Sequence, residues 1–68
     1  MATHFGIAAR YTKDVPLRRA IFTQLKSLGL TDPRWSTREK AEAVLAARIN
    51  DIPEEMRPHV EVFEGMNL

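Results

Sequence analysis

Hydrophobic residues near the N-terminus recur at every second position of the chain. Because successive side chains of a β-strand point to opposite faces of the sheet, this alternation predicts a half-buried strand over residues 3–12. One face of the strand would carry Phe5, Ile7, Ala9 and Tyr11. The other face includes Gly6, which suggests a bulge or the close approach of another backbone.

The hydrophobic spacing then becomes helical, and the residues at both ends of this stretch are typical helix boundaries. Asp14 is a favourable N-cap, and Pro16 falls in the first turn, where a missing N–H costs no hydrogen bond. At the other end, Gly29 suits the left-handed position, and Leu30 would pack back on the helix as in a Schellman motif. We therefore predict a helix over residues 15–28. Its apolar stripe would consist of Leu17, Ile21, Leu25 and Leu28, widened by Ala20 and Phe22.

A second helix is predicted over residues 36–50 from a capping box followed by a run of alanines. The Ser36 hydroxyl can accept a hydrogen bond from the Glu39 backbone N–H, while the Glu39 carboxylate reaches back to Ser36. Trp35 occupies the position of a hydrophobic staple and should be at least partly buried. The connection over residues 31–34 is a turn by composition, so the two helices should pack as an antiparallel hairpin.

The second helix has two distinct small or apolar faces. The first face carries Ala41, Val44, Leu45 and Ile49. The second face carries Ala43, Ala46 and Ala47. High helix propensity explains these alanines, and so does close contact with a partner. Arg48 lies near the end of the helix, where three alternatives stay open: it snorkels, it complements the helix dipole, or it is buried and paired.

The C-terminal third of the chain repeats both patterns on a smaller scale. Asp51 and Pro53 match the capping acid and first-turn proline of the first helix, which predicts a short helix over residues 52–57. Pro58 would end that helix. Residues 59–64 alternate again and predict a second strand, with the rest of the chain as a frayed tail.

These elements define one small α+β domain over residues 1–68, in the order β-α-α-β. The strands at the two chain ends would pair into a small sheet beneath the helical hairpin. A two-stranded sheet is marginally stable and leaves its edges open, so dimerisation would extend it to four strands. Because the 68-residue chain has no cysteine, no disulfide or thiolate metal site can replace that support. We therefore predict a homodimer.

The composition argues against several functional classes. No apolar stretch approaches the roughly 20 residues that span a bilayer, and the N-terminus lacks the features of a signal peptide, so we expect a cytoplasmic protein without membrane contact. No nucleotide-binding, hydrolase, zinc-protease or calcium-binding motif occurs. His4 and His59 would meet if the strands pair, with Glu61 beside them, but ordinary surface histidines explain them better. We predict no metal, no cofactor and no enzyme activity.

Charge is distributed unevenly along the chain. The net charge is +1, yet residues 1–34 hold six basic and two acidic residues, whereas residues 35–68 hold four basic and seven acidic ones. Solvated surface charge explains this pattern, and so does a basic face that binds an acidic partner. Interface hot spots favour arginine and aromatic residues. The candidate partner-binding residues are Arg10, Lys13, Arg18, Arg19 and Trp35.

Residues 5–50 resemble the ribbon-helix-helix repressors, in which paired N-terminal strands enter the major groove of DNA. The resemblance rests on the strand, on Gly29-Leu30-Thr31 after the first helix, and on the polar outward positions of the strand. It implies a DNA-binding transcriptional regulator whose N-terminal basic residues contact phosphates. Gly6 and Ala8 depart from the family pattern, because they occupy positions where base-reading side chains are expected.

The leading hypothesis from the sequence is a small non-enzymatic protein-binding module that acts as a regulator or inhibitor. The small size, the absence of catalytic motifs, the open sheet edges and the charge distribution all favour contact with a protein that has an acidic surface. Chains of this kind are similar in type to accessory proteins of phages and mobile elements, including inhibitors of host defence. The alternative is the DNA-binding regulator that the resemblance implies.

Overall fold

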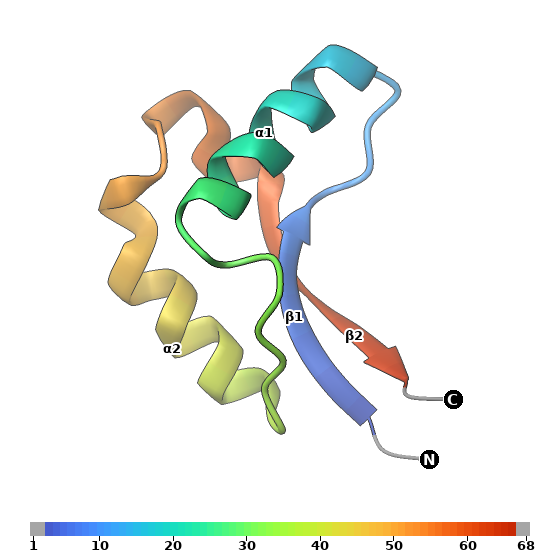
Figure 1. Ribbon diagram of the computed structural model, residues 1–68, viewed down its shortest axis with the longest axis vertical. Helices are drawn as coiled ribbons and strands as arrows, with labels where there is room; N and C mark the ends of the chain where they lie inside the picture. The colour runs from blue at the N-terminus through green and yellow to red at the C-terminus, as the bar shows by residue number, and fades with distance from the viewer. Residues whose placement is uncertain (1–2, 67–68) are drawn as a thin grey trace.

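The two ends of the chain form the sheet, and the helices lie between them in sequence (Figure 1). The computed structural model describes residues 3–66. Its elements are β1 (Thr3–Ala9), α1 (Val15–Ser27), α2 (Arg38–Arg48), the 3₁₀ helices η1 (Ile49–Asp51) and η2 (Glu54–His59), and β2 (Val60–Met66). The predicted α+β class and the β-α-α-β order are confirmed.

The strands β1 and β2 pair antiparallel along their whole length, from Thr3 opposite Met66 to Ala9 opposite Val60. The prediction that the terminal strands pair with each other is therefore confirmed. The first strand is shorter than predicted, because only the Arg10 backbone N–H, which donates to the His59 carbonyl at 2.6 Å, continues the pairing beyond it. The second strand is longer than predicted and includes residues 65 and 66, which were expected in a tail. The rest of that tail lies outside the described residues.

Strand β1 has a hydrogen-bonded neighbour on each of its edges. On the edge away from β2, Phe5 and Trp35 exchange both backbone hydrogen bonds, each at 2.9 Å. Trp35 is half-buried and packs against the core, as predicted. In the ribbon-helix-helix family the N-terminal strand pairs with a second copy of the chain. Here β2 and Trp35 take the two edges of that strand within one chain.

The core fills the space between the sheet and the two helices. It consists of Ile7, Ile21, Leu25, Leu30, Ile52 and Val60, with the predicted apolar stripes of both helices packed around it. Ala20 and Phe22 were expected to widen the stripe of α1, but both are exposed. Each lies one residue, about 100° around the helix, from fully buried Ile21, so each points away from the core.

The predicted boundaries of α1 are confirmed in their atomic detail. The Asp14 carboxylate accepts a hydrogen bond from the Leu17 backbone N–H at 3.1 Å, which satisfies one orphan donor of the first turn. At the other end Gly29 has a φ of +72°, and its N–H donates to the Lys26 carbonyl at 3.0 Å. Leu30 donates to the Leu25 carbonyl at 2.9 Å, which completes the Schellman motif.

Helix α2 begins later than predicted because the preceding residues belong to the sheet. The N-cap is Thr37, whose hydroxyl accepts from the Lys40 backbone N–H at 3.2 Å. The predicted capping box of Ser36 and Glu39, and the staple at Trp35 that depended on it, are therefore wrong. Because the backbone of Trp35 pairs with Phe5, the chain turns helical only after Thr37, whose own backbone is extended, and α2 begins at Arg38.

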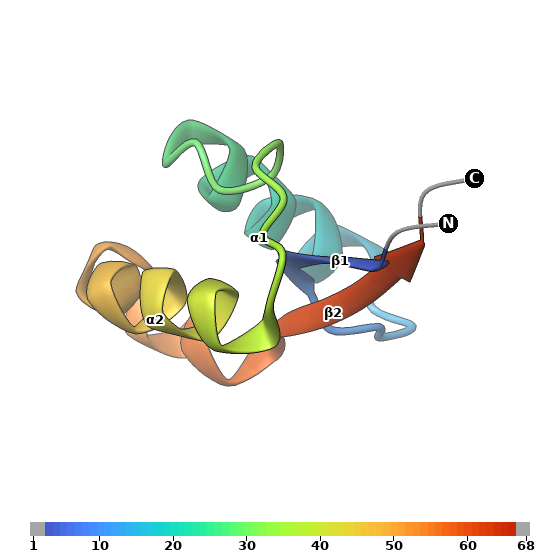
Figure 2. The ribbon, with the colours of Figure 1, turned by 90° about the horizontal axis from the view of Figure 1, so that it is seen from below.

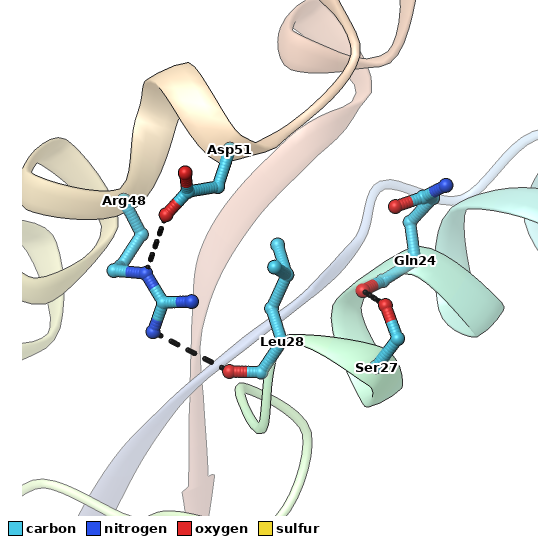
Figure 3. A network of polar contacts seen from close by, with 5 residues as sticks. All are labelled: Gln24, Ser27, Leu28, Arg48 and Asp51. Atoms are coloured by element: carbon cyan, nitrogen blue, oxygen red, sulfur yellow. Dashed lines mark hydrogen bonds and ion pairs between the residues drawn. The ribbon is translucent and has the colours of Figure 1, made fainter.

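The two helices converge at their C-terminal ends, so the predicted antiparallel hairpin is wrong. Figures 1 and 2 show both helices running toward the same side of the molecule. Arg48, the last residue of α2, joins the two ends (Figure 3): its Nη1 donates to the carbonyl of Leu28, the C-cap of α1, at 3.4 Å. Its Nε donates to Asp51 Oδ2 at 2.8 Å. Half-buried Arg48 thus places positive charge where two helix dipoles end.

The 3₁₀ helix η2 replaces the predicted helix over residues 52–57, and η1 replaces the end of the helix predicted over residues 36–50, with extended Ile52 between them. Asp51 was expected to cap that helix, but its carboxylate binds Arg48 instead. Pro58 was expected to end it and lies inside η2, which continues to His59. The buried Ile52 side chain explains the break, because the extended backbone there turns it into the core.

The outer face of the sheet contains two glycines, and an aromatic ring from the opposite strand packs over each of them. Gly6 pairs with Phe63, and a Cβ on Gly6 would lie 2.7 Å from two carbons of the Phe63 ring. Gly65 pairs with His4, and a Cβ on Gly65 would lie 2.5 Å from His4 Nε2. The predicted close approach at Gly6 is therefore real, but a side chain makes it.

We expect Gly6→Ala to destabilise the fold by about 1–3 kcal/mol, because the new methyl group forces the Phe63 ring out of its place. In a Phe63→Leu background those ring carbons are gone, so the cost should fall below about 1 kcal/mol. Urea unfolding of the four proteins in this cycle measures both values. An equal cost of Gly6→Ala in both backgrounds would contradict the proposed contact.

We expect Arg48→Met to destabilise the fold by about 1–2 kcal/mol, because it removes the guanidinium that joins the two helix ends. Lys40→Met is the matched control, since Lys40 is exposed in the first turn of the same helix, and it should stay within about 0.5 kcal/mol of the parent. Thermal unfolding followed by circular dichroism compares the two. Equal stability of both variants would show that Arg48 holds nothing together.

Candidate functional site

The outward face of α1 carries apolar and basic side chains and no acidic one. Helical spacing brings its exposed residues to one side of the helix. The exposed residues of α1 include Val15, Arg19, Phe22, Thr23 and Lys26. The helix contains no aspartate or glutamate, so nothing on it neutralises its three cations. This face therefore combines positive charge with exposed hydrophobic surface.

A shallow hollow of about 470 Å³ lies on this face. Its lining consists of Val15, Arg18, Arg19, Phe22 and Thr23. Phe22 is 54% exposed and Val15 is 41% exposed, so two large apolar side chains lie at the surface beside the hollow. Exposed apolar side chains grouped around a concave surface are typical of an interaction site.

Arg18 connects the hollow to Tyr11, the most exposed of the large apolar residues. The guanidinium carbon of Arg18 lies 5.3 Å from the centre of the Tyr11 ring, within the range of a cation–π contact. Tyr11 is 75% exposed. Arg18 Nε is shielded from solvent and has no hydrogen-bond partner among the described residues. We call the set Tyr11, Val15, Arg18, Arg19 and Phe22 the α1 patch.

The structure brings only some of the predicted partner-binding residues together. Arg18 and Arg19 lie in the α1 patch, and exposed Lys13 lies in the connection that leads into the helix. Arg10 lies elsewhere and forms an ion pair with Glu61 across the strands, at 3.4 Å. Trp35 is held by its pairing with Phe5 and by the core. The five predicted residues are therefore spread over three regions: α1 and the connection before it, the sheet end with Arg10, and the edge of β1 with Trp35.

Sequence reasoning assigned Tyr11 and Phe22, two of the three apolar members of the α1 patch, to buried faces. Tyr11 was expected on the inner face of the first strand, but that strand ends at Ala9. Phe22 was expected in the buried stripe. A usable signal was present, since Val15, Arg19 and Phe22 follow one another at helical spacing on the side opposite Ile21. Apolar residues at such positions indicate an exposed patch.

A second groove, of about 550 Å³, lies between α2 and the outer edge of β2. Its floor is apolar and consists of Leu45, Ala46, Ile49, Val60 and Val62. Arg10 and Glu61 also line it, as do Arg38 and Glu42. Arg38 reaches the strand edge, where its Nη1 donates to the Val62 carbonyl at 3.4 Å.

The histidines do not form a shared site. His4 lies opposite Gly65 near one end of the sheet, whereas His59 pairs with Arg10 beyond the other end, so the expected meeting of the two is wrong. Within residues 3–66 no group of three or more histidine, aspartate or glutamate side chains could hold a metal ion. In the same range, neither α1 nor α2 has the length and apolar character that a membrane span requires.

No protein-family model, curated protein sequence or solved structure matches this chain.

We expect Phe22→Ser to change the free energy of unfolding by less than about 0.5 kcal/mol, because the ring is mostly exposed. Ile21→Ser is the matched comparison one residue earlier, and it should cost about 3 kcal/mol or more, because that side chain is fully buried. The two substitutions change helix propensity by similar small amounts, so the comparison reports on burial. Chemical denaturation measures the two, and a large loss for Phe22→Ser would place its ring in the core rather than in an interaction site.

Proposed function

We propose that this chain is a non-enzymatic protein-binding module, of the regulator or inhibitor type, that engages an acidic partner through the α1 patch. The observation that carries the proposal is that Tyr11, Val15 and Phe22 are exposed beside Arg18 and Arg19, which lie on a helix that contains no acidic residue. A cytoplasmic partner is part of the proposal.

The exposed side chains of the α1 patch are costly to leave in water. Each exposed ring or aliphatic side chain forgoes the free energy of burial, about 25 cal/mol for every Å² of apolar surface. None of them supports the core, which Ile21 and Leu25 fill from the same helix. Burial of such residues against a partner recovers that free energy. Tyrosine and arginine are also the residue types that dominate binding energy at protein interfaces.

The chemistry of the α1 patch defines the partner. A complementary surface would present an apolar group to the hollow beside Phe22 and carboxylates to Arg18 and Arg19. Arg18 Nε has no partner within the described chain and would gain one from a carboxylate in such a complex. These features favour a folded protein or a helix with acidic and apolar residues on one face.

DNA binding is the second candidate, and the acid-free character of α1 favours it. Three cations on one short helix, with Lys13 just before it, could contact phosphates. The apolar centre of the α1 patch supports the protein partner over DNA, since phosphates offer nothing to Phe22 and Val15.

Self-association is also part of the proposal, since a two-stranded sheet in a 68-residue chain without cysteine gains stability from a further strand. A homodimer would supply it.

The protein partner can be tested with a photo-crosslinking amino acid placed at Thr23, inside the hollow, and in a separate protein at Ala43, exposed on α2. In lysate of the source organism, a crosslinked protein should form from position 23 and not from position 43. The product should disappear when Arg19→Glu and Phe22→Ser are added. Lys40→Glu with Ala43→Ser is the matched control, because it makes the same charge change on α2 and should leave the product intact.

Titration of the unmodified protein with random duplex DNA at low salt separates the second candidate. Affinity that falls steeply with salt and is lost with Arg19→Glu would favour the DNA-binding function. If position 23 yields no product that depends on the α1 patch, the protein-binding function is rejected.

A further inference from the structure

We propose that the outer edge of β2, together with the groove beside α2, binds the same edge of a second copy of this chain to form a continuous four-stranded antiparallel sheet. This inference specifies the proposed self-association and is independent of the α1 patch.

Alternate residues of β2 point their backbone N–H and C=O groups away from β1. The backbone N–H and C=O of Phe5 bond Trp35, so they point away from β2. Glu64 lies opposite Phe5 in the antiparallel pair, so its backbone N–H and C=O point away from β1. Arg10 and His59 bond each other across the strands. Because the pattern alternates along an antiparallel ladder, the outward residues of β2 are Val60, Val62 and Glu64.

This edge of β2 is only lightly covered. The Val62 carbonyl accepts one hydrogen bond, from Arg38 Nη1 at 3.4 Å, which is long for such a bond. Arg38 Nη2 lies 3.9 Å from Glu64 Oε1, and both side chains are about half exposed, so this ion pair contributes little stability. An incoming strand can therefore displace Arg38 from the edge at small cost.

An apolar floor lies beside the edge. Leu45 and Ala46 of α2 and Ile49 of η1 line the groove opposite Val60 and Val62. A strand that adds to β2 would place alternate side chains on this floor. Backbone pairing and side-chain burial would therefore occur together, as in other cases where a strand is added to a sheet edge.

The strand that best fits this edge is β2 of a second copy of the chain. In an antiparallel pair centred on Val62, that residue lies opposite itself, and Val60 lies opposite Glu64 of the second copy. This register keeps Glu61 away from its own counterpart.

A partner whose surface is strongly acidic or strongly basic fits this groove less well. Its rims carry Arg10 and Arg38 together with Glu42 and Glu61, so its charges cancel. The balanced rim is complementary to itself under two-fold symmetry, as a dimer of identical chains requires. The other edge of the sheet is unavailable at Phe5, where Trp35 already pairs.

The test compares two arginine substitutions on α2 in the full chain. Ala46→Arg inserts a long cation into the groove, whereas Ala43→Arg alters the same helix at an exposed position outside the groove lining. Both alanines are exposed, so both variants should fold like the parent by circular dichroism. Sedimentation equilibrium over a range of concentrations should show a dimer for the parent and for Ala43→Arg. For Ala46→Arg, the dimer dissociation constant should rise at least about tenfold.

Val62→Pro provides a second variant that addresses the backbone. Its N–H points outward, so proline there removes no bond to β1 and should leave the monomer folded while abolishing the dimer. A parent chain that stays monomeric at millimolar concentration would overturn the inference, as would dimers that survive Ala46→Arg or that Ala43→Arg disrupts equally. Crosslinking from position 23 reports on the α1 patch separately, so failure here leaves that result unaffected.

Discussion

The structure depends on the pairing of β1 at both of its edges. Strand β2 holds one edge along its whole length, and Trp35 holds the other at Phe5. Because each of these partners comes from a distant part of the sequence, one short strand brings the N-terminus, the interhelical connection and the C-terminus together. The start of α2 follows from this arrangement, since the chain between Gly29 and Thr37 has to reach β1 before α2 can begin.

Pairing of the connection with β1 also determines how the helices are oriented. A tight turn would have placed the end of α1 beside the start of α2. The extended connection instead carries the chain down the sheet, so that α2 runs back and its C-terminal end meets that of α1 (Figure 1). The negative ends of two helix dipoles then lie close together, and the positive charge of Arg48 stabilises both. The arginine that the sequence left with three alternatives is therefore explained by a long-range contact.

Local signals predicted the elements well, and long-range pairing explains most of the errors. The cap at Asp14 and the Schellman motif at Gly29 depend on neighbours within a few residues, so the sequence determines them. The start of α2 depends on Phe5, some thirty residues away, and no periodicity reveals that. The candidate site shows the same division: the arginines of α1 were identified from charge, but Phe22 was assigned to the core because hydrophobic residues were assumed to be buried.

The two proposed surfaces differ in what recognises the partner, and together they define one mode of action. In the proposals, the α1 patch binds its partner through side chains, whereas the edge of β2 binds through backbone groups and a groove. Helix α1 packs on β1 and contributes nothing to the groove beside β2, so a dimer formed there leaves both copies of the α1 patch free. A two-fold dimer then presents two identical sites at a fixed separation. Binding at one site raises the effective concentration of the other, so a modest contact area on each 7.8 kDa chain can hold a repeated or dimeric partner firmly.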